Sequence, residues 1–305
     1  MISKAYNNYP RFVFQKDEKS LWNPILKKAF KNRPEERVRL QLIEYLTGEA
    51  DFPKSRISFE TPVKLAKDKG TSRTDIICYD EDFKPLLLVE CKAPEIHLSE
   101  KTARQIGRYN REIEAPYLLI SNGKKDVWFE VTPGSVSQLC FTPKPFVNKR
   151  EHIKNFGYWN ERGFIGSKSD PETRSWLVKT SSFLYDSDNP ENIKFLNFNH
   201  TPPVLALANY YRVFHINDKT RLAIALGSTP FGSTNLNVVL NVEGINTALL
   251  STSLNLIEQG EKANTVLQTA KGTKQIDLIE KTGFSFSVPF LKFEPALSEY
   301  LQRFS

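Results

Sequence analysis

Glu90 and Lys92 stand two residues apart at the end of an apolar run, residues 86–89. In a β-strand, side chains at i and i+2 point to the same face, so the carboxylate and the ammonium group are expected to project together, about 7 Å apart along the strand. Asp75 precedes a second apolar run, and pairing of the two strands would bring Asp75 close to Glu90. Two neighbouring carboxylates repel each other unless a cation lies between them.

Such a pair of carboxylates, with room for water, suits Mg²⁺, a hard octahedral ion that prefers oxygen ligands. Lys92 could then orient or help deprotonate a water, or neutralise charge on a phosphate group. The chemistry indicated is metal-dependent hydrolysis of a phosphodiester. The alternative is a surface ion pair, but Glu90 and Lys92 end an otherwise apolar strand, which makes a solvated face the weaker explanation.

The surrounding pattern predicts an α/β domain that positions these residues. Residues 34–47 form an amphipathic helix that begins at Pro34, with Glu35 and Glu36 in its first turn. Three β-like runs follow (56–65, 73–80 and 84–94), then a helix over 100–113 that Ser99 can cap, and two more strands (116–123 and 125–131). Gln105 and Tyr109 are four residues apart and therefore share one face of the second helix. This order predicts a mixed sheet flanked by helices.

These motifs resemble a known nuclease family. Asp75, followed after fourteen residues by Glu90-Cys91-Lys92, is similar to the PD-(D/E)xK nuclease motif. The segments NPILKKAFKNRPEERVR, RTDIICYD, LLLVECKAP, QIGRYN and LISNG occur in that order. Together they resemble the N-terminal nuclease domain of type I restriction enzyme R subunits, in a compact stand-alone form, over roughly residues 20–131.

The resemblance implies a set of site residues. Asp75 and Glu90 would ligate Mg²⁺, for which Mn²⁺ could substitute, and the Cys91 carbonyl would add a ligand. Lys92 would be the catalytic lysine. The metal-activated water would attack phosphorus, and loss of the 3′-oxygen would leave a 5′-phosphate.

The family's pattern also includes a helix with Gln and Tyr, matched here by Gln105 and Tyr109, which would support the site and contact the DNA backbone. It further includes an acid in the first helix. The E-x-x-V-R spacing favours Glu35 over Glu36 for that role, although first-turn acids also stabilise the helix dipole. Thr74 stands where the motif's name has proline, a common variation that leaves the assignment in place.

The charge distribution favours a polyanionic partner. The net charge is +7, and residues 1–150 contain 27 basic and 20 acidic residues, so the whole excess lies in that half. Basic surfaces attract nucleic acids, although solubility alone can explain a modest excess. Five basic residues near the predicted site could contact phosphates or could simply form a solvated surface: Arg73, Lys101, Arg104, Arg108 and Arg111.

The chain is predicted to contain two domains. Residues 1–131 form the nuclease-like domain and residues 132–175 a linker rich in Pro, Gly, Lys and aromatic residues. Residues 176–305 alternate apolar and polar positions between turn residues, which predicts a mainly antiparallel β-sandwich closed by a short helix near the C-terminus. That domain could select the target, form a dimer or bind a partner protein.

Two further expectations concern location and function. The sequence contains neither a signal-peptide pattern nor an apolar run that could span a bilayer, and three widely spaced cysteines favour reduced thiols, so we expect a cytoplasmic protein without membrane contact. The leading functional hypothesis is a DNA endonuclease used in defence against foreign DNA, acting as a homodimer if it cuts both strands. The alternatives are an inactive nuclease-fold module that binds nucleic acid or protein, and an enzyme that processes RNA or nucleotide ends.

Overall fold

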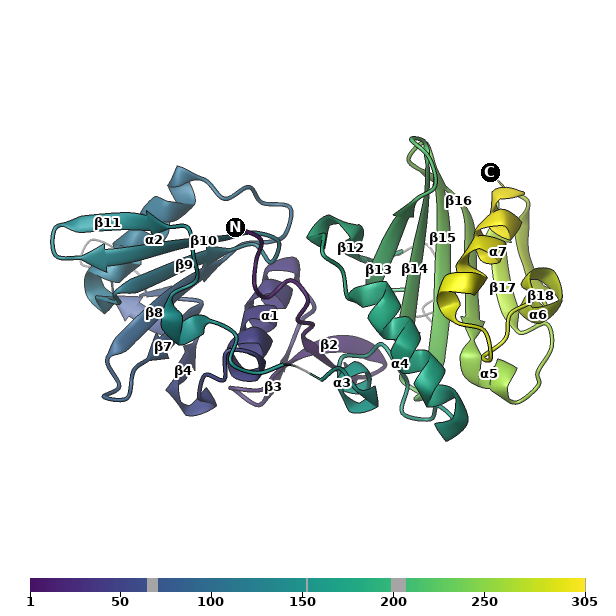
Figure 1. Ribbon diagram of the computed structural model, residues 1–305, viewed down its shortest axis with the longest axis horizontal. Helices are drawn as coiled ribbons and strands as arrows, with labels where there is room; N and C mark the ends of the chain where they lie inside the picture. Colours follow the sequence, from purple (N-terminus) through teal and green to yellow (C-terminus); the bar gives the residue numbers. More distant parts are fainter. Residues whose placement is uncertain (65–70, 152, 199–206, 305) are drawn as a thin grey trace. The chain divides into compact units, whose positions relative to one another are not determined.

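The computed structural model describes residues 1–64, 71–151, 153–198 and 207–304. The chain divides into two compact units, Met1–His152 and Ile153–Ser305 (Figure 1). Each unit contains its own sheet and helices, so each is described by itself. Among the described residues, no helix has the length and apolar character needed to cross a membrane.

The N-terminal unit is built on a six-stranded mixed sheet with the order β11-β10-β9-β8-β7-β4. All its pairs are antiparallel except β8 with β9, which α2 connects. The unit also contains a three-stranded sheet, β1-β2-β3, and a two-stranded one, β5-β6. Its elements are β1 (Arg11–Gln15), β2 (Glu18–Asn23), β3 (Lys28–Phe30), α1 (Pro34–Gly48), η1 (Lys54–Arg56), β4 (Ile57–Phe59), β5 (Pro62–Lys64), β6 (Thr71–Arg73), β7 (Ile76–Tyr79), β8 (Pro85–Cys91), α2 (Glu100–Ile113), β9 (Tyr117–Ser121), β10 (Asp126–Thr132), β11 (Ser135–Leu139) and η2 (Lys144–Phe146).

Alternation along β8 determines which side chains face which helix. Leu88 belongs to a buried cluster with Ile77 of β7 and Ile106 of α2, so the Leu88 face is the one that α2 covers. Glu90 is two residues further on and shares that face. Leu87 and Val89 are fully buried on the opposite face, and α1 also packs against β8. The strand therefore holds Glu90 beside α2 at the end of an apolar core.

The predicted elements of this unit are largely confirmed. Both helices occur where expected, and the strands 73–80, 84–94, 116–123 and 125–131 correspond to β7 to β10. Two details differ. Ser99 occupies the N-cap position of α2 without a side-chain capping bond. The run 56–65 divides into β4 and β5, which pair with different strands because Glu60, at φ 51°, interrupts the extended chain.

The C-terminal unit contains one seven-stranded sheet with the order β12 to β18, and every pair in it is antiparallel. Helices α4 and α7 lie on one face of this sheet (Figure 1). Its elements are α3 (Phe156–Glu161), α4 (Pro171–Tyr185), η3 (Pro190–Asn192), β12 (Ile193–Leu196), β13 (Asn209–His215), β14 (Thr220–Ser228), β15 (Thr234–Val242), β16 (Ile245–Ser253), α5 (Leu254–Glu258), β17 (Thr265–Thr269), β18 (Gly272–Ile276), α6 (Leu278–Thr282) and α7 (Phe290–Gln302).

The antiparallel character of this unit and its terminal helix are confirmed, but the second layer is helical rather than a second sheet. Residues 175–185, interpreted as strand-like, belong to α4. Pro171 stands in the first turn of that helix, and Asp170 accepts a hydrogen bond from the Glu172 N–H. The buried positions Trp176, Leu177 and Thr180 follow helical spacing, which outweighs the short apolar and polar alternation.

The segment predicted as a linker, 132–175, contains ordered elements of both units. β11 pairs with β10 along the edge of the N-terminal sheet. Phe146 is fully buried, with its ring stacked 5.7 Å from that of Trp128. In the C-terminal unit, Trp159 is fully buried beside Phe164. Aromatic residues of this segment thus pack into both units, whereas Phe141 is 62% exposed.

Candidate active site

Asp75 and Glu90 lie across from each other where β7 begins and β8 ends. Ile76 pairs with Val89 in the antiparallel register, so the preceding and following residues are the next cross-strand neighbours. Both side chains are buried, with Asp75 8% exposed and Glu90 4% exposed. The predicted convergence of these two carboxylates is what the strand register produces.

One carboxylate oxygen of Glu90 accepts hydrogen bonds from two side chains. Lys92 Nζ lies 2.6 Å from Glu90 Oε1, and Gln105 Nε2 donates to the same atom at 2.7 Å. Lys92 directly follows β8, the strand that contains Glu90, whereas Gln105 comes from α2, which packs over that strand. The helix and the strand together therefore fix the orientation of the Glu90 carboxylate.

Asp75 is fixed by a backbone donor and a cation. The Cys91 N–H donates to Asp75 Oδ2 at 2.6 Å. β7 begins only at Ile76, so it provides no backbone acceptor opposite Cys91, and the Asp75 side chain takes that place. Arg39 of α1 forms an ion pair with Asp75, with Nε 3.0 Å from Oδ1. The Cys91 side chain is fully buried. Its role as a carbonyl ligand stays a prediction.

Burial makes these carboxylates difficult to ionise. Burial raises the pKa of Glu90 to about 7, the negative charge of Asp75 contributes to that increase, and Lys92 opposes it. Burial likewise raises the pKa of Asp75, against the opposing effects of Arg39 and the Cys91 N–H. Burial acts to lower the pKa of Lys92. The hydrogen bond and the negative charge of Glu90 outweigh this effect, so the pKa of Lys92 is raised. Lys92 is therefore a cation at neutral pH, suited to neutralise phosphate charge.

The two acids of the first helical turn have different surroundings. Glu36 is 7% exposed, and its Oε2 accepts a 2.9 Å hydrogen bond from Arg39 Nη1. Burial raises the pKa of Glu36 to about 7, which Arg39 partly counteracts. Glu35 is half-buried, and its negative charge contributes to the raised pKa of both Asp75 and Glu90. Glu35 thus acts electrostatically on the site, while Glu36 is the acid bound to Arg39.

Arg39 and Glu60 are functional candidates that the sequence reasoning missed. Arg39 Nη1 also donates to Glu60 Oε1 at 3.1 Å, so one guanidinium group serves Glu36, Glu60 and Asp75. The signal for Arg39 was present in the E-x-x-V-R spacing, since i, i+3 and i, i+4 residues share a helix face. Glu60 lies in the turn between β4 and β5 and has no comparable signal.

The donor set fits a hard divalent cation. Two buried carboxylates have raised pKa values, so a cation would relieve the unfavourable desolvation of their charged forms. Glu36 Oε1 is buried with no hydrogen-bond partner, which adds one unsatisfied carboxylate oxygen beside the Arg39 guanidinium group. Within the described parts of the chain, however, no three His, Cys, Asp or Glu side chains converge as a ready set of ligands. Water and backbone oxygens would have to complete the coordination, as Mg²⁺ commonly requires.

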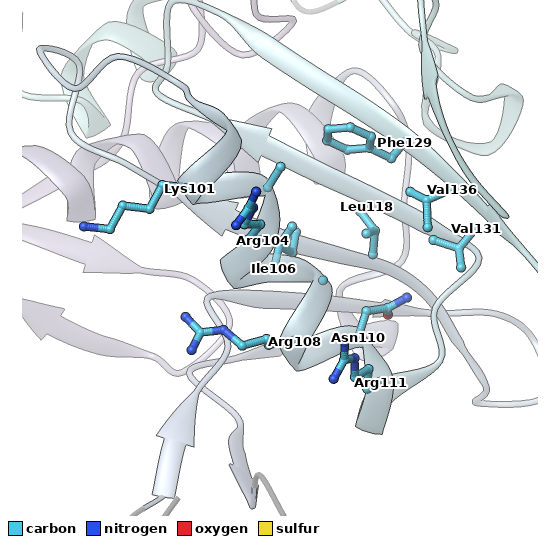
Figure 2. Close-up of a pocket in the computed structure, with 12 residues that line it drawn as sticks. Lys101, Arg104, Ile106, Arg108, Asn110, Arg111, Leu118, Phe129, Val131 and Val136 are labelled. Atoms are coloured by element: carbon cyan, nitrogen blue, oxygen red, sulfur yellow. The ribbon is translucent and has the colours of Figure 1, made fainter. Parts of the chain in front are cut away.

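The basic residues predicted to contact nucleic acid lie on two elements. Arg73 is exposed at the end of β6, directly before Thr74 and Asp75. Tyr109 packs its ring against the buried cluster around Ile106 and Leu88. Four basic residues of α2 are exposed and line one groove: Lys101, Arg104, Arg108 and Arg111 (Figure 2).

Comparison with known proteins finds a similarity to one family in the central part of this unit. A search of curated proteins finds no match to the chain. Residues 34–141, roughly a third of the chain, match the family described as type I restriction enzyme R protein N terminus (HSDR_N). The match begins with α1, includes Asp75, Glu90, Lys92 and Gln105, and ends just after β11. Residues 34–141 of the N-terminal unit are therefore similar to the N-terminal domain of type I restriction enzyme R proteins.

Proposed function

We propose that the N-terminal unit hydrolyses phosphodiester bonds of DNA with the help of Mg²⁺, for which Mn²⁺ can substitute. The observation that carries this proposal is the arrangement at Glu90, whose buried carboxylate lies beside Asp75 and receives both Lys92 and Gln105. Buried titratable groups with raised pKa values are typical of functional sites. The family of the domain, that of restriction enzymes, supports the same reaction class.

Each residue has a distinct role in this proposal. Asp75 and Glu90 would hold the ion, with the Cys91 carbonyl as a further oxygen ligand. The ion, when bound, supplies Lewis acidity and lowers the pKa of water. Lys92 remains protonated, orients the attacking water and stabilises negative charge on the phosphate group. Gln105 maintains the orientation of Glu90, and Glu35 tunes the charge of the site.

The direct test uses the purified full chain with supercoiled, linear and single-stranded DNA in the presence of Mg²⁺ or Mn²⁺. Lys92→Ala and Asp75→Asn should each lower the cleavage rate by about 100-fold or more. Two matched controls are exposed: Lys84→Ala (Lys84 side chain 75% exposed) and Asp82→Asn (Asp82 side chain 78% exposed) should both cleave at the original rate. Cleavage that survives Lys92→Ala or Asp75→Asn would exclude this site.

The second candidate is a module that binds DNA without cleaving it. The Arg39 ion pair favours this alternative, because a guanidinium group already compensates the charge of Asp75. Binding of DNA by the intact chain, with no product under either metal, would support the module and contradict the nuclease. Cleavage of both strands by a chain with one such site requires two copies, so a homodimer is part of the nuclease proposal.

A further inference from the structure

A groove of about 780 Å³ runs between α2 and the strands β9, β10 and β11 (Figure 2). It is formed entirely by residues of the N-terminal unit. We define the α2 groove by its lining residues: Lys101, Ala103, Arg104, Ile106, Gly107, Arg108, Asn110, Arg111, Leu118, Phe129, Val131 and Val136. We propose that the α2 groove binds an unpaired segment of the nucleic-acid substrate, with phosphates against α2 and bases against the strands.

The helix side of the groove is cationic. Among the described lining residues there are four cations and no carboxylate. Lys101, Arg104, Arg108 and Arg111 repeat every three or four residues and extend about 15 Å along the helix axis. Arg104 is paired with Glu100, but both side chains are more than three-quarters exposed, so water weakens that pair. A polyanion lying along α2 is the complementary ligand.

The strand side of the groove is apolar and continuous. Phe129 of β10 pairs with the buried Leu118 of β9, and Val131 pairs with Val136 of β11, so Phe129, Val131 and Val136 form one accessible strip across two strands. Val136 is 63% exposed at the edge of the sheet. Bases of a single strand can pack their faces on such a strip, whereas a duplex covers its base faces by stacking. The pairing of a cationic wall with an apolar one therefore favours an unpaired strand.

Gly107 keeps the groove open. It lies in the middle of α2, where glycine destabilises a helix by about 1 kcal/mol relative to alanine. A Cβ atom added at Gly107 would meet nothing within 4 Å, so neither packing nor backbone conformation requires glycine there. A larger residue at this position would project into the space that the ligand is proposed to occupy.

An acidic amphipathic peptide is the other occupant that this chemistry could accept. Nucleic acid is favoured because α2 also provides Gln105, which donates to Glu90. Gln105 is not among the lining residues, so a strand held in the groove would pass over α2 to reach the carboxylates. The choice of nucleic acid over an acidic peptide thus rests on the proposed phosphodiesterase function. The shape and the positive charge of the groove are independent of that function.

The test measures binding of a fluorescent oligothymidine of about 15 nucleotides to the full chain in EDTA, by anisotropy. Gly107→Leu should weaken binding by about tenfold, because it fills the groove and removes no charge. Gly107→Ala should bind within about twofold of the original protein, since one methyl group is small beside the groove. Thermal unfolding of both variants verifies that α2 is retained.

Introducing a negative charge on the strand side gives an independent variant. Val136→Glu places a carboxylate on the apolar strip and should also weaken binding by about tenfold. Phe83→Glu is the matched control, because Phe83 is 66% exposed on the turn before β8 and is no part of the groove. Unchanged binding by both Gly107→Leu and Val136→Glu, or no binding by the original protein, would overturn the proposal. Competition by polyglutamate as strong as that by unlabelled oligothymidine would overturn it in favour of an acidic peptide. Because EDTA prevents metal-dependent cleavage, these outcomes are separate from those of the Asp75 and Lys92 variants.

Discussion

Arg39 and Asp75 form an ion pair between α1 and the start of β7, with Arg39 Nε 3.0 Å from Asp75 Oδ1. The Arg39 side chain is only 14% exposed, and its guanidinium group also contacts Glu36 and Glu60. One cation thus connects the helix, the turn after β4 and the proposed metal-binding carboxylate. The stability of the metal-free site depends on it.

Removing that cation should destabilise the protein strongly. Arg39→Ala leaves buried carboxylates without a partner, and the loss of one member of a buried ion pair costs about 3–5 kcal/mol. In EDTA, we expect the free energy of unfolding to decrease by an amount near the upper end of that range. Urea denaturation provides the measurement. Arg104→Ala, which removes an exposed pair, should change it by less than about 0.5 kcal/mol. A decrease below 1 kcal/mol for Arg39→Ala would contradict this account.

Glu36 should make stability depend on pH. Its pKa is about 7 in the folded chain and 4.5 in the unfolded chain, so its contribution is fully present below pH 4.5 and is lost as the pH rises through 7. Glu36→Gln mimics the protonated form at every pH. It should therefore be more stable than the original protein by up to about 3 kcal/mol at pH 8 and equal to it near pH 4.

Thermal and urea unfolding in EDTA at these two pH values provide the measurement. Glu112→Gln, at an exposed position of α2, is the control and should show no such difference. A Glu36→Gln variant that is less stable than the original protein at pH 8 would show that the bond to Arg39 outweighs the burial of the charge.

A divalent cation should stabilise the folded chain through the proposed ligands. Mg²⁺ at about 100 times its dissociation constant adds about 2.7 kcal/mol if it binds only the folded state. We expect a higher melting temperature with Mg²⁺ than with EDTA at matched ionic strength. Asp75→Asn should abolish the increase, whereas Asp82→Asn, on an exposed turn, should retain it. An increase of equal size in Asp75→Asn would place the bound ion elsewhere.

Gln105 is expected to act by positioning Glu90. Gln105→Ala removes the 2.7 Å hydrogen bond from α2, and loss of such a supporting bond typically lowers metal affinity or activity by about 10–100-fold. The concentration of Mg²⁺ for half-maximal cleavage should rise accordingly, measured on supercoiled DNA. The decisive comparison is the cleavage rate at saturating Mg²⁺, which should recover substantially. A rate that stays low at every Mg²⁺ concentration, with unchanged apparent affinity, would indicate another role.

Trp176 should anchor the helical layer of the C-terminal unit. Its indole Nε1 donates to the Val288 carbonyl at 2.8 Å, and its ring contacts Phe284 and Phe290 edge-on. Trp176→Ala should lower the free energy of unfolding by about 3–5 kcal/mol in urea denaturation. Phe231→Ala, at a residue 68% exposed, should change it by less than about 0.5 kcal/mol. Similar effects of the two substitutions would show that the aromatic cluster does not stabilise this unit.

Local patterns in the sequence were sufficient to predict the elements around the site. The period of two along the run 84–94 places Glu90 and Lys92 on one face, and the spacing of four along α2 does the same for Gln105 and Tyr109. These are local rules that depend on backbone geometry alone. The same rules misassigned residues 175–185 as a strand, because Trp176, Leu177 and Leu184 also follow helical spacing, and Asp170 caps the helix that they form.

Contacts between groups of different elements follow from the three-dimensional fold. The spacing along α1 places Arg39 beside Glu36, but its contacts with Glu60 and Asp75 depend on how α1 packs beside the sheet. Likewise, the basic residues of α2 form one wall of a groove because β10 and β11 extend the sheet beyond the helix. Local periodicity fixes the direction of a side chain within its own element, whereas its neighbours follow from packing between elements distant in the chain.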